Sequence, residues 1–134
     1  MLNDDEIRWR QIFENYEKAF LALQRHKDES FYKQIEKAGD IHYFEIVLDL
    51  ASRVMFAYLN AKGKSTDNFR HAVKELNIEG VVQNQNTWFK AYNRRKLPLF
   101  LHKNEKLFDE LVLDINETYF IELEYFYQKL MERK

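Results

Sequence analysis

The segment from Asp40 to Gly63 constrains the fold of this chain more than any other stretch. Its main apolar residues recur at steps of four, three, four and three, which places them on one face of an α-helix. These residues are Phe44, Leu48, Ala51, Met55 and Tyr58. Further apolar residues widen the stripe, so we expect partner helices to bury this helix on several sides. We expect Asp40 to be its N-cap and Gly63 to follow its last turn.

The same spacing predicts a long helix at each end of the chain. The first begins at Asp4 or Asp5 and ends near His26, and the last begins near Asn104. The inward residues of the first helix are Trp9, Phe13, Tyr16, Phe20 and Leu23. Those of the last helix are Phe108, Leu111, Ile115, Tyr119, Leu123, Phe126 and Leu130.

Shorter helices are expected between these long ones. One covers residues 31–38 and ends at Gly39. Two more follow the central helix, and the second of them breaks before Pro98, which cannot donate to a helical hydrogen-bond ladder. The candidate N-caps are Thr66 or Asp67 for the former, and Asn84, Asn86 or Thr87 for the latter.

The composition is typical of a helical protein. The 134 residues include three glycines, one proline and no cysteine, which favours helices with short connections and excludes disulfides. We therefore predict one all-α domain over residues 1–134, an up-and-down, four-helix-bundle-like helical bundle with additional short helices. Because the chain has no run of about 18 apolar residues and no signal-like start, we expect no membrane association and a cytoplasmic location.

Residues 88–103 form the most basic segment of a chain whose net charge is −1. That net charge gives no global attraction for nucleic acid, so any such site must be a local patch. Arg95 suits bidentate contact with a phosphate, and His102 suits general acid or base chemistry. Near one phosphodiester, the two side chains would support RNA cleavage. Alternatively, these cations decorate a helix C-terminus, where the helix dipole favours positive charge.

Glu45 and Asp49 lie four residues apart on one flank of the central helix. They are candidates to pair with Arg70 or with the cations of residues 94–96, or else they form a solvated acidic face. The candidate substrate-binding residues are Glu45, Asp49, Arg94 and Lys96. The four histidines show no metal-ligand spacing, so we expect no metal site and no cofactor.

Several stretches in a fixed order carry a resemblance to a known family. They are IRWRQIFENYEKA, YFEIVLDLA, YLNAKG, FRHAVKELNI and INETYFIELEYFYQKL, together with Trp88 seven residues before Arg95. This order, which covers nearly the whole chain, resembles the nucleotidyltransferase substrate-binding protein family, a branch of the HEPN superfamily of helical bundles.

The resemblance implies an all-α bundle that forms a homodimer and pairs with a separate small subunit of the nucleotidyltransferase fold. In that arrangement the partner holds nucleotide and metal, and the helical subunit helps to bind the acceptor substrate. This chain contains no match to the partner's Gly-Ser and paired-aspartate signature, so we do not expect it to transfer nucleotides by itself.

Many HEPN proteins are instead ribonuclease toxins of toxin–antitoxin pairs, whose motif is an arginine, four to six residues and a histidine. Here six residues separate Arg95 and His102. In a gapless alignment from Trp88, the histidine position holds Phe100, and His102 occupies the position of a tyrosine that the partner adenylylates.

The leading hypothesis is a non-catalytic substrate-binding or interaction subunit, homodimeric, that works with a separate nucleotidyltransferase subunit. The alternative is a metal-independent endoribonuclease that uses Arg95 and His102, with RNA or a nucleotide as its ligand. A third interpretation is a structural bundle that has lost its ancestral role.

Overall fold

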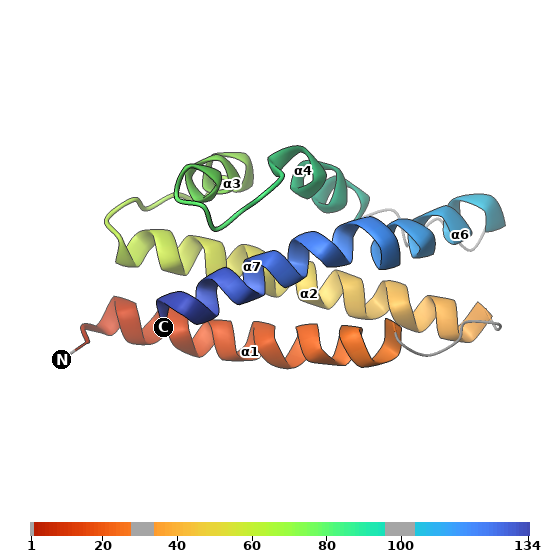
Figure 1. The fold of residues 1–134 in the computed structure, drawn as a ribbon, viewed down its shortest axis with the longest axis horizontal. Helices are drawn as coiled ribbons and strands as arrows, with labels where there is room; N and C mark the ends of the chain where they lie inside the picture. The colour runs from red at the N-terminus through yellow and green to blue at the C-terminus, as the bar shows by residue number, and fades with distance from the viewer. Residues whose placement is uncertain (1, 28–33, 96–103) are drawn as a thin grey trace.

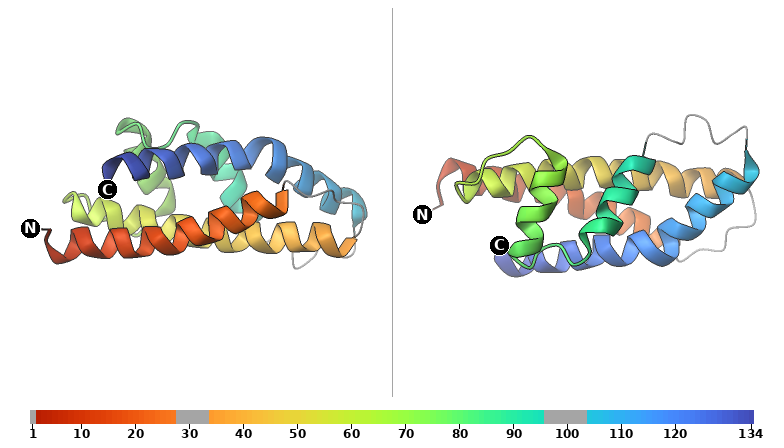
Figure 2. Two further views of the ribbon diagram at one scale, coloured as in Figure 1. Left: turned by 60° about the horizontal axis from the view of Figure 1, so that its bottom comes forward. Right: turned by 90° about the horizontal axis from the view of Figure 1, so that it is seen from above.

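A computed structural model describes residues 2–27, 34–95 and 104–134, and these form an all-α bundle (Figure 1). The body consists of three rods. The first two are α1 (Asp4–Lys27) and α2 (Gln34–Ala61). The third rod is made of α6 (Glu105–Asp114), the π-helical turn η1 (Ile115–Tyr119) and α7 (Phe120–Arg133). Two short helices, α3 (Phe69–Ile78) and α4 (Gln85–Arg94), lie across the rods (Figure 2). The predicted all-α bundle with additional short helices is confirmed. No helix in these ranges is long and apolar enough to cross a membrane.

The core consists largely of aromatic side chains that meet between α1, α2 and α7. All five predicted inward residues of α1 are buried. The Phe20 ring of α1 stacks on the Phe120 ring of α7 with 5.3 Å between centroids. The Tyr16 hydroxyl donates a hydrogen bond of 2.8 Å to the Leu123 carbonyl, so this polar group is satisfied although the tyrosine is fully buried.

Helix α2 begins earlier than the sequence indicates. It runs from Gln34 through Gly39 and Asp40 to Ala61 without a break, so the predictions that Gly39 ends a helix and that Asp40 caps one are wrong. Residues 31–33, where the short helix was expected to begin, lie outside the described residues. A Cβ atom on Gly39 would lie 3.2 Å from Cε1 of His26, so this glycine allows α1 and α2 to approach closely. The predicted turn at Gly63, with φ of 78°, is confirmed.

An asparagine side chain caps the N-terminus of α3, α4 and α6. The Asn68 side chain accepts a hydrogen bond of 2.9 Å from the His71 N–H, so the prediction of Thr66 or Asp67 as the cap of α3 is wrong. Thr66 instead accepts a hydrogen bond from the Asn68 N–H and shapes the turn before the helix. Of the three candidate caps of α4, Asn84 is confirmed and Asn86 and Thr87 lie within the helix, and the predicted start near Asn104 is confirmed as the cap of α6.

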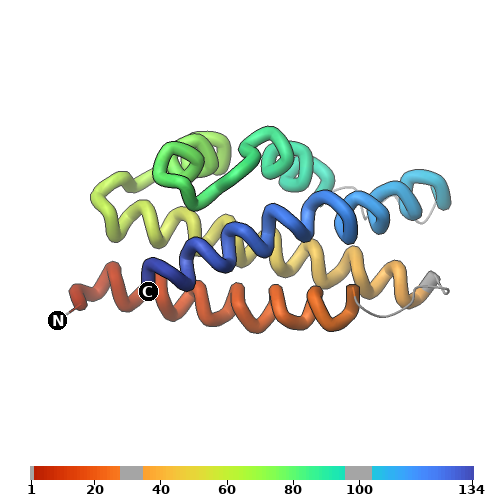
Figure 3. The backbone as a smooth tube through the Cα atoms, in the orientation of Figure 1, coloured from red at the N-terminus to blue at the C-terminus, as the bar shows by residue number. Residues whose placement is uncertain are grey.

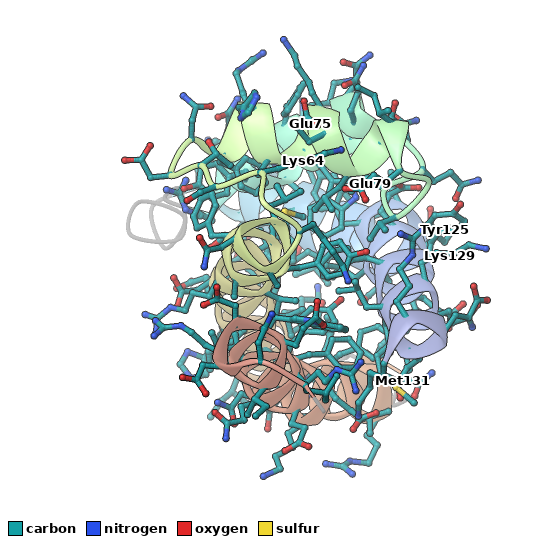
Figure 4. All side chains as sticks on the ribbon, turned by 90° about the vertical axis from the view of Figure 1, so that its left-hand side faces the viewer. Lys64, Glu75, Glu79, Tyr125, Lys129 and Met131 are labelled. Atoms are coloured by element: carbon teal, nitrogen blue, oxygen red, sulfur yellow. The ribbon has the colours of Figure 1, made fainter. Side chains whose placement is uncertain are left out.

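The turn between α3 and α4 packs on the rods. Val81 and Val82 are buried, and the Tyr125 hydroxyl of α7 donates a 3.1 Å hydrogen bond to the Gly80 carbonyl. In Figure 4, a view along the rods, Lys64 and Glu75 lie where α3 meets the end of α2, with 3.7 Å between their charged atoms. These contacts fix the α3–α4 layer on the bundle from both sides.

The third rod follows one continuous path in Figure 3, although its middle turn is π-helical. The predicted inward residues from Leu111 to Leu130 are buried, and Phe108 is half-buried. The sequence did not indicate η1. π-Helical turns occur frequently at functional sites, and this one ends at Tyr119, which faces Arg94 of α4.

Candidate functional site

Arg94, a predicted substrate-binding residue, is tied into the fold. Its guanidinium donates hydrogen bonds to the Asp114 carboxylate and, at 2.9 Å, to the Tyr119 hydroxyl. Burial lowers the pKa of Arg94, but the hydrogen bonds to these two groups outweigh that effect, and the net pKa is raised. Arg94 therefore joins the end of α4 to the third rod.

Arg95, the predicted catalytic arginine, lies over an aromatic ring. Its Cζ atom is 3.4 Å from the Tyr92 ring centroid, and its Nη1 donates a 2.7 Å hydrogen bond to the Tyr92 carbonyl. On α3, the Phe69 ring stacks on Tyr92 with 3.8 Å between centroids. His102 and Lys96 lie outside the described residues, so the convergence of Arg95 with His102 stays a prediction.

The two acidic candidates lie on α2, away from the partners considered for them. Asp49 pairs with Arg53 at 3.2 Å rather than with Arg70 or Arg94, and both members of the pair are exposed. Glu45 is half-buried, and burial raises its pKa while His42 opposes the shift. Among the described residues, the solvated acidic face is therefore the better account of Asp49, and the substrate-binding role of both residues stays a prediction.

The start of α3 and the end of α4 line an open pocket of about 330 Å³. We call it the α3–α4 pocket, and its lining residues are Asp67, Asn68, Phe69, Arg70, Phe89, Tyr92 and Asn93. The Arg70 Cζ atom lies 4.4 Å from the centroid of the Phe89 ring. Sequence reasoning missed this pocket because its two halves are about twenty residues apart and share no local motif.

A larger groove of about 620 Å³ runs between α1 and α2. We call it the α1–α2 groove. Its apolar lining residues are Ile12, Leu50, Phe56 and Ala57, and its charged ones are Asp5, Arg8 and Arg53. All the apolar ones are half-buried and pack against the core. This mixture resembles a protein–protein contact surface, in which an apolar centre is surrounded by polar groups.

Asp40 is a buried carboxyl group beside α1. Its side chain is fully buried, and neither Oδ atom has a hydrogen-bond partner. Burial raises the pKa of Asp40 to about 6, and the nearby charges of His26 and Lys27 act against this shift. The sequence analysis missed this environment because it placed Asp40 at a helix start. Elsewhere in residues 2–27, 34–95 and 104–134, no three His, Asp or Glu side chains gather as metal ligands.

Comparison with known proteins identifies the family of this bundle. The family described as nucleotidyltransferase substrate binding protein like matches residues 11–132. The matched range includes the α3–α4 pocket and all helices described above except the first turns of α1 and the last residue of α7, whereas Asp5 and Arg8 of the α1–α2 groove precede it. A search of curated proteins found no match. Because the family match extends over nearly the entire chain, the protein belongs to the nucleotidyltransferase substrate-binding-protein-like family.

Proposed function

We propose that the protein is a non-catalytic substrate-binding subunit that works with a separate nucleotidyltransferase subunit. The observation that carries this proposal is the family match over residues 11–132. Two of its surface cavities support it, because a substrate-binding subunit needs one surface for its partner and another for its ligand.

The α1–α2 groove is the surface that we assign to the nucleotidyltransferase subunit. Its apolar floor, with Leu50 and Phe56, offers the contact area from which interfaces gain most of their stability. Arg8 and Arg53 at its margin are exposed, and charged margins guide the approach of a complementary partner.

The protein also forms a homodimer in this proposal, as the family resemblance implies. Two copies of this chain are expected within the complete assembly, each with one nucleotidyltransferase subunit. Light scattering on the purified chain measures the mass of the dimer directly, and a monomeric mass would contradict this part of the proposal.

The test is affinity capture of the tagged chain from its native cells, followed by mass spectrometry. Wild-type protein is expected to capture a nucleotidyltransferase-fold protein in equal amount. Arg8→Glu reverses an exposed charge in the α1–α2 groove and is expected to reduce the capture at least several-fold. Arg25→Glu is the matched control, because Arg25 is also exposed on α1 but does not line the groove.

Three outcomes decide the proposal. If Arg8→Glu weakens the capture and Arg25→Glu does not, the result supports both the function and the contact surface. If neither variant changes the capture, the result supports the function but overturns the assignment of the groove. A chain that captures no nucleotidyltransferase-fold protein would contradict the proposed function itself.

A further inference from the structure

We propose that a third surface cavity, between the start of α4 and α7, binds the primary ammonium group of a small organic amine. We call this cavity the α4–α7 pocket, and its volume is about 450 Å³. Its lining residues are Asn77, Gln83, Asn84, Gln85, Ile121 and Glu122. The inference goes beyond the proposed function, which uses neither this pocket nor its residues. It is carried by the juxtaposition of the Glu122 carboxylate with the carboxamide side chains around the turn between α3 and α4.

The turn between α3 and α4 forms one wall of the pocket. In the right-hand view of Figure 2, this turn runs beside the third rod. Asn77 closes the turn, because its Nδ2 donates hydrogen bonds of 3.0 and 3.2 Å to the Val82 and Gln83 carbonyls. These bonds engage the amide N–H₂ group of Asn77 and leave its Oδ1 to accept a hydrogen bond from a ligand. The fold therefore positions an acceptor in the wall before any ligand binds.

Glu122 is the charged group of the pocket. Among the six lining residues it is the one with an ionisable side chain, and only 8% of its surface is exposed. Its Oε1 accepts a 2.8 Å hydrogen bond from the Asn84 N–H. Within residues 2–27, 34–95 and 104–134, its carboxylate pairs with no cation and its Oε2 has no hydrogen-bond partner. Because a buried charge without a counter-charge is unfavourable, a bound cation would be stabilised here.

The local charge of the pocket favours a cation over an anion. Helix α4 begins at Gln85, and a helix N-terminus carries roughly half a positive charge, which offsets only part of a full carboxylate charge. Burial raises the pKa of Glu122, and the hydrogen bond from the Asn84 N–H opposes this shift. A cation beside Oε2 would favour the ionised carboxylate further, whereas a carboxylate or phosphate ligand would be repelled by it.

One open carboxylate oxygen suits an ammonium group better than a guanidinium group. A guanidinium binds a carboxylate best through two parallel hydrogen bonds, and Oε1 of Glu122 is already bonded to Asn84. A primary ammonium group is compact and has three N–H donors, so one can pair with Oε2 and the carboxamide oxygens of Asn77 and Gln85 can accept the others. Ile121 is 57% exposed and offers apolar contact to the carbon skeleton of the amine.

Trp88 provides a spectroscopic reporter next to the pocket. Trp88 and Glu122 both line a small internal cavity, and the Trp88 indole N–H is buried without a hydrogen-bond partner among the residues that the structure describes. Trp9, the other tryptophan of the chain, lines neither cavity, and its indole N–H donates a 2.8 Å hydrogen bond to Glu6. The two indole N–H signals therefore distinguish binding in the pocket from a general effect on the protein.

The experiment titrates the full chain, labelled with ¹⁵N, with butylammonium, tetramethylammonium and butyrate, and follows both indole signals by NMR. Butylammonium is expected to shift the Trp88 signal saturably and to leave the Trp9 signal unchanged. Tetramethylammonium should bind more weakly, because it has no N–H donor, and butyrate should not bind.

Substitutions on α7 test the role of the carboxylate. Glu122→Gln removes the charge but keeps an oxygen for the Asn84 N–H, and it is expected to weaken butylammonium binding about tenfold or more. Glu124→Gln is the matched control, because Glu124 is a nearby acidic residue of α7 that does not line the pocket. This variant should bind butylammonium as wild type does.

Gln85→Glu tests the pocket in the opposite direction. It adds a second carboxylate at the first position of α4, where the helix dipole favours negative charge, so it is expected to tighten butylammonium binding several-fold. If Glu122→Gln does not fold, Gln85→Glu decides alone.

Three results would overturn the inference. They are no saturable shift of the Trp88 signal, binding of tetramethylammonium or butyrate as tight as that of butylammonium, and wild-type affinity in folded Glu122→Gln or in Gln85→Glu. Since the titration uses the chain alone, these results leave the proposed function untouched, and failure to capture a nucleotidyltransferase subunit leaves this inference untouched.

Discussion

The rods and the α3–α4 layer use their aromatic rings differently. Between α1 and α7, rings such as Phe20 are almost fully buried and pack against other rings. In the layer, Phe89 and Tyr92 are half-buried, and an arginine lies on each of them. Phe20 therefore contributes buried contact to the fold, whereas Phe89 and Tyr92 each hold an arginine at the surface of the layer.

Arg94 and Arg95 show the same difference between neighbours in sequence. Arg94 pairs with Asp114 and Tyr119 and so links α4 to the third rod. Arg95 rests on Tyr92 and pairs with no carboxylate among the described residues. Sequence position alone does not indicate which of the two arginines pairs with the third rod, because this depends on which side of α4 faces that rod.

The largest expected effect compares one phenylalanine from each region. Phe20→Ala should lower the free energy of unfolding by about 3–5 kcal/mol, because it removes a fully buried ring and leaves a cavity. Phe89→Ala should lower it by only about 1 kcal/mol, because that ring is half-exposed. Urea unfolding followed by circular dichroism measures both free energies. Equal losses in the two variants would contradict the difference between the rods and the layer.

Asp40 is a carboxyl group buried within the rods and should make stability depend on pH. Its pKa is about 6 in the folded protein against an ordinary 3.8, so the folded state binds the proton more tightly than the unfolded state. This contribution to stability is fully present below about pH 4 and is lost as the pH rises through 6, by about 3 kcal/mol in total.

Asp40→Asn should remove this pH dependence and make the protein more stable than wild type at pH 7. The measurement is urea unfolding of both proteins at several values between pH 4 and pH 7. The difference between them isolates Asp40 from other titrating groups, and a constant difference across this range would contradict the assignment.

Substitutions of Arg94 and Arg95 should change the free energy of unfolding by smaller amounts, and by different amounts from each other. Arg94→Ala should lower the free energy of unfolding by about 1–2 kcal/mol, because charged hydrogen bonds to Asp114 and Tyr119 are lost. Arg95→Ala should lower it by less than about 1 kcal/mol, since it loses only a half-buried cation–π contact and one hydrogen bond to a neighbouring carbonyl. Thermal unfolding of both variants checks the order, and a reversed order would show that Arg95 is the structural residue.

The smallest effect is expected at Asp49. Asp49→Asn should change the free energy of unfolding by no more than about 0.5 kcal/mol, because Asp49 and Arg53 form an exposed pair one helical turn apart. The same urea titration measures this change. A loss above 1 kcal/mol would indicate that the acidic flank of α2 contributes to the fold.

Periodicity predicted the long helices because apolar residues at helical spacing leave few alternatives. It placed the buried faces of α1 and α2 and the last rod correctly. It failed at Gly39, which reads as a helix end in sequence but provides close contact between helices in the structure. The π-helical turn before Phe120 was also missed, because one added residue in a turn leaves no compositional signal.

The candidate site was less predictable than the fold. The sequence indicated the cations after Trp88 as candidates, and the structure shows that Arg94 forms an ion pair with Asp114. Arg70 was considered only as a partner for acidic residues, and its position over Phe89 follows from the packing of α3 against α4. Contacts between distant segments of this kind depend on helix orientation, which residue spacing within one helix does not specify.

The most direct test of the account is the rate of nucleotidyl transfer by the captured nucleotidyltransferase subunit, measured with and without this chain. We expect transfer to the acceptor to require the chain and to fall when Arg8→Glu, which should weaken the contact with the partner, replaces the wild-type protein. Equal transfer in the absence of the chain would contradict its role as the substrate-binding subunit.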